Sequence, residues 1–231
     1  DTEVGYYFSL AKSQGLLKDY DGVINTTSLG IENELVKAAR IAAGDRSFLC
    51  DVGRFNGDYF VYVAAFGIFT EVSYQTSQDM KNIFGHAAYL MEAVGQLADI
   101  PAICMTAEYD DVILEDEFIY GMITNATSVG GIKGIVSGDI SLNDGVFEVT
   151  LIRTPKNPLE LSEIIGYLTN IIKETQLVYS FQTAHLKLSS QDEVAWTLDG
   201  EYGGKHSEVE VFILPEAMEI MVESADDFGY N

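Results

Sequence analysis

The 231-residue sequence has few basic residues, with 13 lysines and arginines against 36 acidic residues and a formal net charge of -23. Nucleic acids and anionic membrane surfaces are bound through clustered lysine and arginine, so this balance argues against both as main partners. No apolar run reaches the ~18 residues that indicate a membrane-spanning helix. The sequence has no basic segment followed by an apolar one, the pattern that indicates a secretory signal peptide.

Cysteine is also scarce, and the two residues, Cys50 and Cys104, do not form a C-x-x-C pair. One disulfide between them is an open alternative, but a reduced cytosolic protein is favoured. The three histidines, His86, His185 and His206, are scattered, and no H-E-x-x-H motif or Cys/His cluster predicts zinc.

Two helices are predicted, over residues 77–99 and 158–174, from apolar residues at helical spacing. Ser77 is a suitable cap for the first, and Asn157 with Pro158 suits the start of the second. The expected apolar stripe of the second helix consists of Leu161, Ile164, Ile165, Leu168, Ile171 and Ile172.

Most of the remainder after Cys50 is rich in β-branched and aromatic residues, which favour strands. The expected strands cover residues 59–66, 102–109, 118–124, 145–153, 176–189, 193–198 and 208–214. Turn signals separate them at Asn56-Gly57, Asp110-Asp111, Asn143-Asp144-Gly145 and Asp199-Gly200. The pattern predicts an α+β chain whose C-terminal part is a β-sandwich with helical excursions.

The first fifty residues have a different pattern. Residues 3–18 and 32–43 favour helices, the second ending at Gly44, and residues 20–24 favour a short buried strand. This is α/β material, but too little for a complete parallel-sheet domain.

Several motifs resemble those of bacterial diacylglycerol kinases and related lipid kinases, in the same order and at similar spacing over residues 47–215. They are residues 51–60 (DVGRFNGDYF), 67–74 (GIFTEVSY), 81–85 (KNIFG), 89–90 (YL), 124–125 (TN), 130–131 (GG), 142–145 (LNDG) and 198–204 (LDGEYGG). Each motif is weak alone, and their combination carries the resemblance.

The resemblance implies a two-domain plan shared with sphingosine kinases and NAD kinases. An N-terminal Rossmann-like α/β domain carries a GGDGT nucleotide loop, and a C-terminal β-sandwich completes the cleft. We therefore expect residues 1–46 to be a partial nucleotide-binding domain and residues 47–231 to be the lipid kinase domain. The GGDGT loop is absent, and residues 20–31 resemble two family segments joined with the intervening stretch left out. Either those residues are missing from the sequence, or this homologue has lost its nucleotide domain.

Glu201 is the expected general base, because it matches that residue of the family and lies beside the glycines Gly200, Gly203 and Gly204. A phosphoryl acceptor hydroxyl needs a group that accepts its proton. Asp199 matches the acidic neighbour that orients the site or helps to hold magnesium. Taken alone, Asp199-Gly200 could equally be a hairpin turn with solvated acids.

The family also holds a structural Mg²⁺ with one aspartate side chain and two backbone carbonyls. These match Asp144, Ser141 and Val146, although Ser141 is often a different residue in relatives. Mg²⁺ commonly keeps several waters and few carboxylates, which suits one side chain. Without the resemblance, Asn143-Asp144-Gly145 is an ordinary turn.

Three further residues are candidates. Asn125 is expected near the cleft between the domains, and Lys81 and Lys133 are candidate phosphate contacts, although most lysines are solvated surface groups. The acidic residues between 108 and 117 indicate a solvated hairpin and not a metal cluster.

The resemblance implies ATP-dependent phosphorylation of a lipid hydroxyl, with diacylglycerol converted to phosphatidic acid as the default reaction and Mg²⁺ as cofactor. The enzyme would be cytoplasmic and peripherally associated with the membrane that holds its substrate. A homodimer is left open. The alternatives are a kinase for a sphingoid base, another lipid or a soluble alcohol, or a non-catalytic lipid-binding β-sandwich that has lost its nucleotide site.

Overall fold

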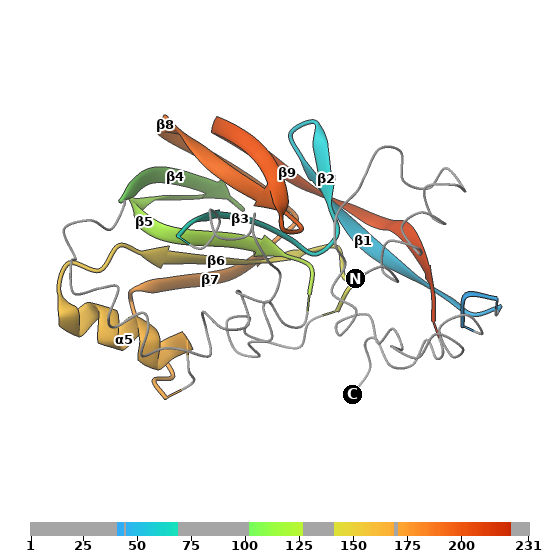
Figure 1. Cartoon of the computed structure of the whole chain (residues 1–231), viewed down its shortest axis with the longest axis horizontal. Coiled ribbons are helices and arrows are strands. Elements are labelled where there is room, and N and C mark those ends of the chain that lie inside the picture. Colours follow the sequence, from blue (N-terminus) through green and yellow to red (C-terminus); the bar gives the residue numbers. More distant parts are fainter. Residues whose placement is uncertain (1–40, 44, 69–101, 127–140, 169–170, 223–231) are drawn as a thin grey trace.

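The computed structural model describes residues 41–43, 45–68, 102–126, 141–168 and 171–222. They form one nine-stranded sheet, and the one complete helix among the described residues is α5 (Figure 1). The elements are β1 (Ser47–Phe55), β2 (Asp58–Phe60), β3 (Val63–Gly67), β4 (Ile103–Tyr109), β5 (Val112–Thr124), β6 (Phe147–Arg153), α5 (Pro158–Leu168), β7 (Val178–Thr183), β8 (His185–Leu198) and β9 (Glu201–Met221).

The strand order is β2-β1-β9-β8-β3-β5-β6-β7, and β4 also lies between β8 and β5. β3 pairs with residues 120–124 of β5, and β4 pairs with residues 112–118 of the same strand. β3 and β4 therefore lie end to end in the sheet, and both are placed between β5 and β8. The predicted helix over residues 77–99 falls in the connection between them, outside the described residues.

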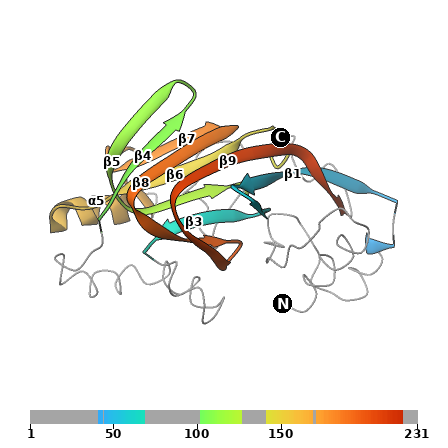
Figure 2. The same ribbon diagram turned by 90° about the horizontal axis from the view of Figure 1, so that it is seen from above.

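The sheet curls so that distant strands face each other. The rings of Phe60 in β2 and Phe147 in β6 have centroids 5.5 Å apart, although several strands separate β2 and β6 in the hydrogen-bonded order. Figure 2 shows this curvature from above, with β9 arching along the sheet. The predicted predominance of strands is confirmed, but the described strands form one curled sheet and not the two sheets of the expected sandwich.

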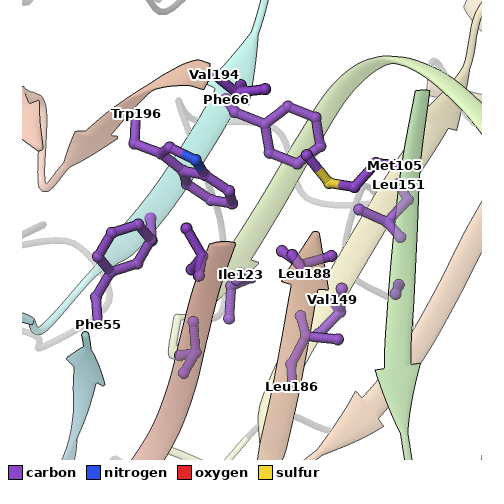
Figure 3. Close-up of a cluster of buried hydrophobic side chains, with 14 of the residues drawn as sticks. Phe55, Phe66, Met105, Ile123, Val149, Leu151, Leu186, Leu188, Val194 and Trp196 are labelled. Carbon is purple, nitrogen blue, oxygen red and sulfur yellow. The ribbon is translucent and has the colours of Figure 1, made fainter. Parts of the chain in front are cut away.

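The main core lies inside the curl and contains Trp196 in β8, with Phe55 and Phe66 against it (Figure 3). The Trp196 ring lies 4.9 Å from that of Phe55 and 4.8 Å from that of Phe66, measured between centroids. Burying each of these side chains stabilises the fold by about 1.5–3 kcal/mol. Packing between the rings adds about 0.5–1.5 kcal/mol per pair.

β1 was not among the predicted strands, yet it pairs along most of its length with β9. The register shifts between Cys50, which is opposite Met218, and Val52, which is opposite Leu214. Three residues of β9 therefore face Asp51 alone, and this β-bulge contains Pro215 and Glu216, the latter with φ +51°. Pro is tolerated there because a bulge interrupts the hydrogen-bond ladder.

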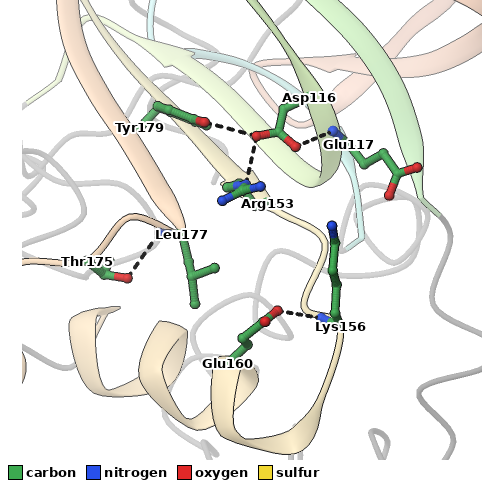
Figure 4. Close-up of polar contacts among 8 residues, drawn as sticks. All are labelled: Asp116, Glu117, Arg153, Lys156, Glu160, Thr175, Leu177 and Tyr179. Atoms are coloured by element: carbon green, nitrogen blue, oxygen red, sulfur yellow. Dashed lines mark hydrogen bonds and ion pairs between the residues drawn. The ribbon is translucent and has the colours of Figure 1, made fainter.

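α5 begins as predicted. Asn157 caps it, since its Oδ1 accepts hydrogen bonds from the N–H groups of Leu159 and Glu160, both at 3.0 Å. Glu160 reaches back to the N–H of Lys156 at 2.6 Å (Figure 4), which resembles a capping box.

The end of α5 was predicted too late, at residue 174. The helix ends at Leu168, and the N–H of Ile171 donates to the Gly166 carbonyl at 2.9 Å, a bond across five residues that closes helix C-termini. Ile171 is 80% exposed, so its place in the predicted apolar stripe was wrong. Of the predicted helix over residues 32–43, only Ile41 and Ala42 are described as helical.

Asp116, in the acidic hairpin formed by β4 and β5, contacts Arg153 and Tyr179 (Figure 4). Its Oδ2 lies 2.7 Å from Nε of Arg153 and accepts a hydrogen bond from the Tyr179 hydroxyl at 2.9 Å. Burial would raise the pKa of Asp116, but hydrogen bonds from the Glu117 N–H, Tyr179 and Arg153 outweigh it and lower the pKa. Asp116 is therefore a structural anion and not a solvated one.

Candidate functional site

The predicted hairpin turn at Asp199-Gly200 joins β8 to β9. Both residues have positive φ, +50° and +89°, and the flanking residues Leu198 and Glu201 are paired. This is the backbone conformation that favours Asp-Gly in two-residue hairpins. The local sequence therefore accounts for the turn that presents Glu201 as the first residue of β9.

Asp199 points inward and is 3% exposed. Its Oδ1 accepts hydrogen bonds from the N–H groups of Tyr62 at 2.8 Å and Val63 at 2.7 Å, and its Oδ2 accepts one from Val61 at 2.8 Å. Burial raises the pKa of Asp199 to about 7, although the three N–H groups act in the opposite direction. Asp199 thus anchors the hairpin turn to the β2–β3 connection.

Glu201 lies two residues further on and is exposed. Among the described residues, no hydrogen bond or ion pair to its carboxylate is found. The two acids that the sequence grouped together are therefore in opposite situations. Asp199 has its oxygens occupied by the protein backbone, whereas Glu201 is accessible to a ligand.

The turn that carries the predicted magnesium ligands precedes β6. Asp144 is exposed, and its Oδ1 accepts a 3.3 Å hydrogen bond from the N–H of Val146. Ser141 donates from Oγ to Oδ1 of Asn143 at 2.8 Å. Partial burial raises the pKa of Asp144, the Val146 N–H lowers it, and the nearby charge of Asp51 raises it again. Ser141, Asp144 and Val146 thus belong to one compact turn, which local sequence is sufficient to form.

Asp51 holds this turn in place and was not identified as a site residue from the sequence. It is fully buried, at 0% exposure. Its Oδ2 accepts a hydrogen bond from the N–H of Gly145 at 2.8 Å, and its Oδ1 accepts one from the N–H of Glu216 at 2.7 Å. Its own N–H donates to the Leu142 carbonyl at 2.8 Å. Asp51 therefore joins β1, the Asp144 turn and the bulge of β9.

Asn125, predicted near the cleft between the domains, is a buried link in this junction, at 4% exposure. Its Nδ2 donates to the carbonyls of Asp51 at 3.1 Å and Leu142 at 3.2 Å. Its backbone N–H donates to the carbonyl of Tyr62 at 3.2 Å, in the segment that also binds Asp199. A continuous hydrogen-bonded path thus connects the two acid-bearing turns through Asn125.

Glu148 is a second buried acid that sequence reasoning missed, at 3% exposure in β6. Its Oε1 accepts a hydrogen bond from Nε2 of Gln182 at 3.1 Å, and its buried Oε2 has no hydrogen-bond partner among the described groups. Burial and then the charge of Asp144 raise its pKa to about 7, and Gln182 lowers it. The available signal was a charged residue within the apolar strand Phe147–Arg153.

The remaining predicted contacts, Lys81 and Lys133, lie outside the described residues. Within the described ranges, no three His, Cys, Asp or Glu residues are grouped as a metal site. In the same part of the chain, no helix combines the length and apolar character needed to cross a membrane.

No family model matches the sequence. The chain is 29% identical over 180 residues to a diacylglycerol kinase of Staphylococcus haemolyticus, a match covering 77% of this chain and 54% of that protein. It is 28% identical over 183 residues to the diacylglycerol kinase of Bacillus subtilis, covering 77% and 58%. The chain thus spans a little over half the length of these curated relatives.

The fold is similar to the crystal structure of a diacylglycerol kinase from Bacillus anthracis, with a TM-score of 0.59, 15% identity, and coverage of 87% of this chain and 63% of that one. A second Bacillus anthracis structure assigned to the same family gives a TM-score of 0.66 at 18% identity, with coverage of 87% and 65%. The resemblance to bacterial diacylglycerol kinases that the motifs indicated is confirmed.

Proposed function

We propose that this chain is the lipid-binding and base-carrying part of an ATP-dependent lipid kinase, with diacylglycerol as the default acceptor and phosphatidic acid as the product. The observation that carries the proposal is the contrast between Asp199 and Glu201. A rigidly anchored turn presents one exposed carboxylate that no described protein group occupies. The bacterial diacylglycerol kinases to which the chain is similar support the reaction class.

In this proposal Glu201 accepts the proton of the lipid hydroxyl as that oxygen attacks the γ-phosphorus of ATP. The bond from the γ-phosphorus to the β–γ bridging oxygen breaks, and ADP leaves. Such a base contributes about 10²–10⁴-fold to the rate. Asp199 does not touch the reacting atoms. It keeps the turn from moving, because three backbone N–H groups hold its carboxylate.

We also propose that residues 1–46 belong to the nucleotide-binding domain and residues 47–231 to the lipid kinase domain. The N-terminal domain then holds most of the nucleotide. ATP is then the co-substrate, and the protein contacts the membrane peripherally to reach its lipid.

The Asp144 turn fits a magnesium ion. The Asp144 carboxylate and the carbonyls of Ser141 and Val146 would hold it, and oxygen ligands with several waters are what Mg²⁺ prefers. The environment supports a cation, because Asp144 has the negative charges of Asp51 and Glu148 nearby and Oε2 of Glu148 has no described partner. When bound, the ion would neutralise this charge and stiffen the turn.

The test is a kinase assay on the full-length protein with diacylglycerol, a sphingoid base and a soluble alcohol as acceptors. Glu201→Gln should reduce kcat by about 10²–10⁴-fold on the preferred acceptor. Its thermal unfolding should be unchanged, because the Glu201 carboxylate has no hydrogen-bond or ion-pair partner among the described residues. Glu193→Gln, at another exposed position of the same hairpin, is the matched control and should keep full activity.

Full activity of Glu201→Gln would remove it as the base. Phosphorylation of a sphingoid base or a soluble alcohol, but not of diacylglycerol, would reassign the acceptor. If the full-length protein phosphorylates none of the three but binds lipid vesicles, it is a non-catalytic lipid-binding protein. The 231 residues contain no GGDGT loop, so the lipid-binding outcome without phosphorylation is worth testing.

A further inference from the structure

The two glycines after Glu201 form a β-bulge in β9. Thr197 of β8 is paired with Tyr202, and Ala195 is paired with Lys205. Trp196 alone therefore faces two residues, Gly203 and Gly204. An extra residue of this kind bends a strand and redirects its side chains.

Both bulge positions require glycine. Gly204 has φ +91°, which residues with a side chain rarely adopt. A Cβ on Gly203 would lie 2.8 Å from Cγ of Leu198, which is tighter than real Cβ contacts allow. Gly203 and Gly204 thus have a structural role in the bulge.

The bulge puts Glu201 and His206 on the same face of β9. His206 is paired with Val194, and Glu201 is paired with Leu198, and both partners belong to the main core inside the curl. Paired residues share a face, so His206 and Glu201 lie on the same face of β9. Their spacing of five is odd, and in an unbulged strand they would lie on opposite faces.

His206 holds the bulge directly. Its Nε2 lies 2.9 Å from the Gly203 carbonyl oxygen, and because a carbonyl only accepts, Nε2 carries the hydrogen. The same nitrogen lies 2.7 Å from where a Cβ of Gly204 would be, so the imidazole covers that glycine. The ring also meets Phe55 edge-on, with centroids 5.5 Å apart and an interplanar angle of 69°. The imidazole is thus wedged between the bulge and the core.

We propose that His206 is a positioning residue for Glu201, acting through its hydrogen bond to the carbonyl of Gly203 in the bulge. The inference rests on the proposed function, in which Glu201 accepts the substrate proton. The hydrogen bond holds the carbonyl of Gly203, two residues after Glu201, and so constrains the backbone that carries Glu201. A misplaced base loses rate even when binding is intact.

The test compares His206→Leu, which loses the donor, with His206→Gln, whose side-chain amide can donate to the same carbonyl. His185→Gln is the control, since His185 lies on the same hairpin, away from the bulge, where its Nε2 lies 3.0 Å from Oε1 of Glu210. In the full-length enzyme, His206→Leu should lower kcat by about 10–100-fold. Its KM for ATP should stay within about twofold. His206→Gln should recover most of the lost rate.

A second readout is independent of catalysis. In protein labelled with ¹³C at glutamate side chains, the carboxylate resonance of Glu201 should move in His206→Leu, return toward its original position in His206→Gln, and stay unchanged in His185→Gln. Amide exchange at Gly203 and Gly204 should be faster in His206→Leu alone.

The outcomes separate the two proposals. Wild-type rates and an unmoved Glu201 resonance in His206→Leu would overturn the positioning role. Equal losses in both His206 variants, together with equally lowered thermal stability, would also overturn it in favour of a purely structural role. If the wild-type protein phosphorylates nothing, the proposed function fails, while the Glu201 resonance still decides whether His206 sets its position.

Discussion

In the turn between β8 and β9, Asp199 of the Asp-Gly pair is buried and accepts hydrogen bonds from three backbone N–H groups. In the turn before β6, the aspartate of the Asp144-Gly145 pair is exposed and accepts one long hydrogen bond from its own turn. There the anchor is a different acid, Asp51, which reaches the turn from β1. Each turn thus combines one buried anchoring acid with one exposed acid, Glu201 or Asp144.

Acids that lie close together at a turn are therefore not interchangeable. A buried carboxylate whose oxygens are filled by backbone donors is an element of the fold, whereas an exposed one beside it is available to a proton or a cation. The two anchors differ in reach: Asp51 binds two segments of the chain through its side chain, whereas Asp199 binds one short segment.

The largest expected effect is at Asp51. Asp51→Ala leaves the N–H groups of Gly145 and Glu216 without their acceptor. At about 1–3 kcal/mol for each unsatisfied group, it should lower the free energy of unfolding by about 2–6 kcal/mol. Urea denaturation measures this as a lower transition midpoint. Asp51→Asn keeps one acceptor oxygen and should lose less. A loss below about 1 kcal/mol for the alanine variant would mean that water replaces the anchor.

Asp199→Asn should have an intermediate effect of about 1–3 kcal/mol, because the amide nitrogen cannot accept the N–H of Val61. The loss should depend on pH. The folded-state pKa of Asp199 is about 7, above its usual 3.8, so the native state holds a proton that the unfolded state has released between these values. The contribution of Asp199 to stability is therefore fully present below pH ~4 and is lost as pH rises through ~7.

The stability difference between wild type and Asp199→Asn should accordingly be largest in acid and shrink toward pH 8. Chemical denaturation at a series of pH values measures it, and Glu193→Gln is the control for a surface acid. A difference that grows with pH would mean that the three N–H groups outweigh burial and hold Asp199 as a carboxylate.

The smallest expected effect on the metal-free protein is at Asp144. Asp144→Ala removes one long hydrogen bond and should cost about 0.5–1 kcal/mol. Added Mg²⁺ should raise the melting temperature of the wild type, since binding to the native state alone stabilises it, and should not raise that of Asp144→Ala. Asp192→Ala, at an exposed position of β8, should respond like wild type. An equal rise in melting temperature with Mg²⁺ in Asp144→Ala and Asp192→Ala would mean that the ion does not bind at this turn.

Local features of the fold were predictable because each depends on a few neighbouring residues. The turns at Asn56-Gly57 and Asp199-Gly200 and the Asn157 cap of α5 follow from side chains within three positions of the backbone they shape. The strand β1 was missed because its central residues, Asp51, Gly53 and Arg54, break the apolar pattern. The Asp51 carboxylate accepts the hydrogen bonds that join β1 to the Asp144 turn and the bulge of β9. Gly53 lacks a side chain because the Phe60 ring lies 2.2 Å from where its Cβ would be.

The strand-rich class, the hairpin turns and the similarity to diacylglycerol kinases follow from residue order and spacing. Which acids act as anchors depends on tertiary contacts. The donors that bind Asp199 are 136 to 138 positions away, and those that bind Asp51 are 94 and 165 positions away. The shared face of Glu201 and His206 likewise depends on a bulge, which appears only when β9 is paired against β8. Burial and pairing are properties of segments brought together from distant parts of the chain, and no local pattern encodes them.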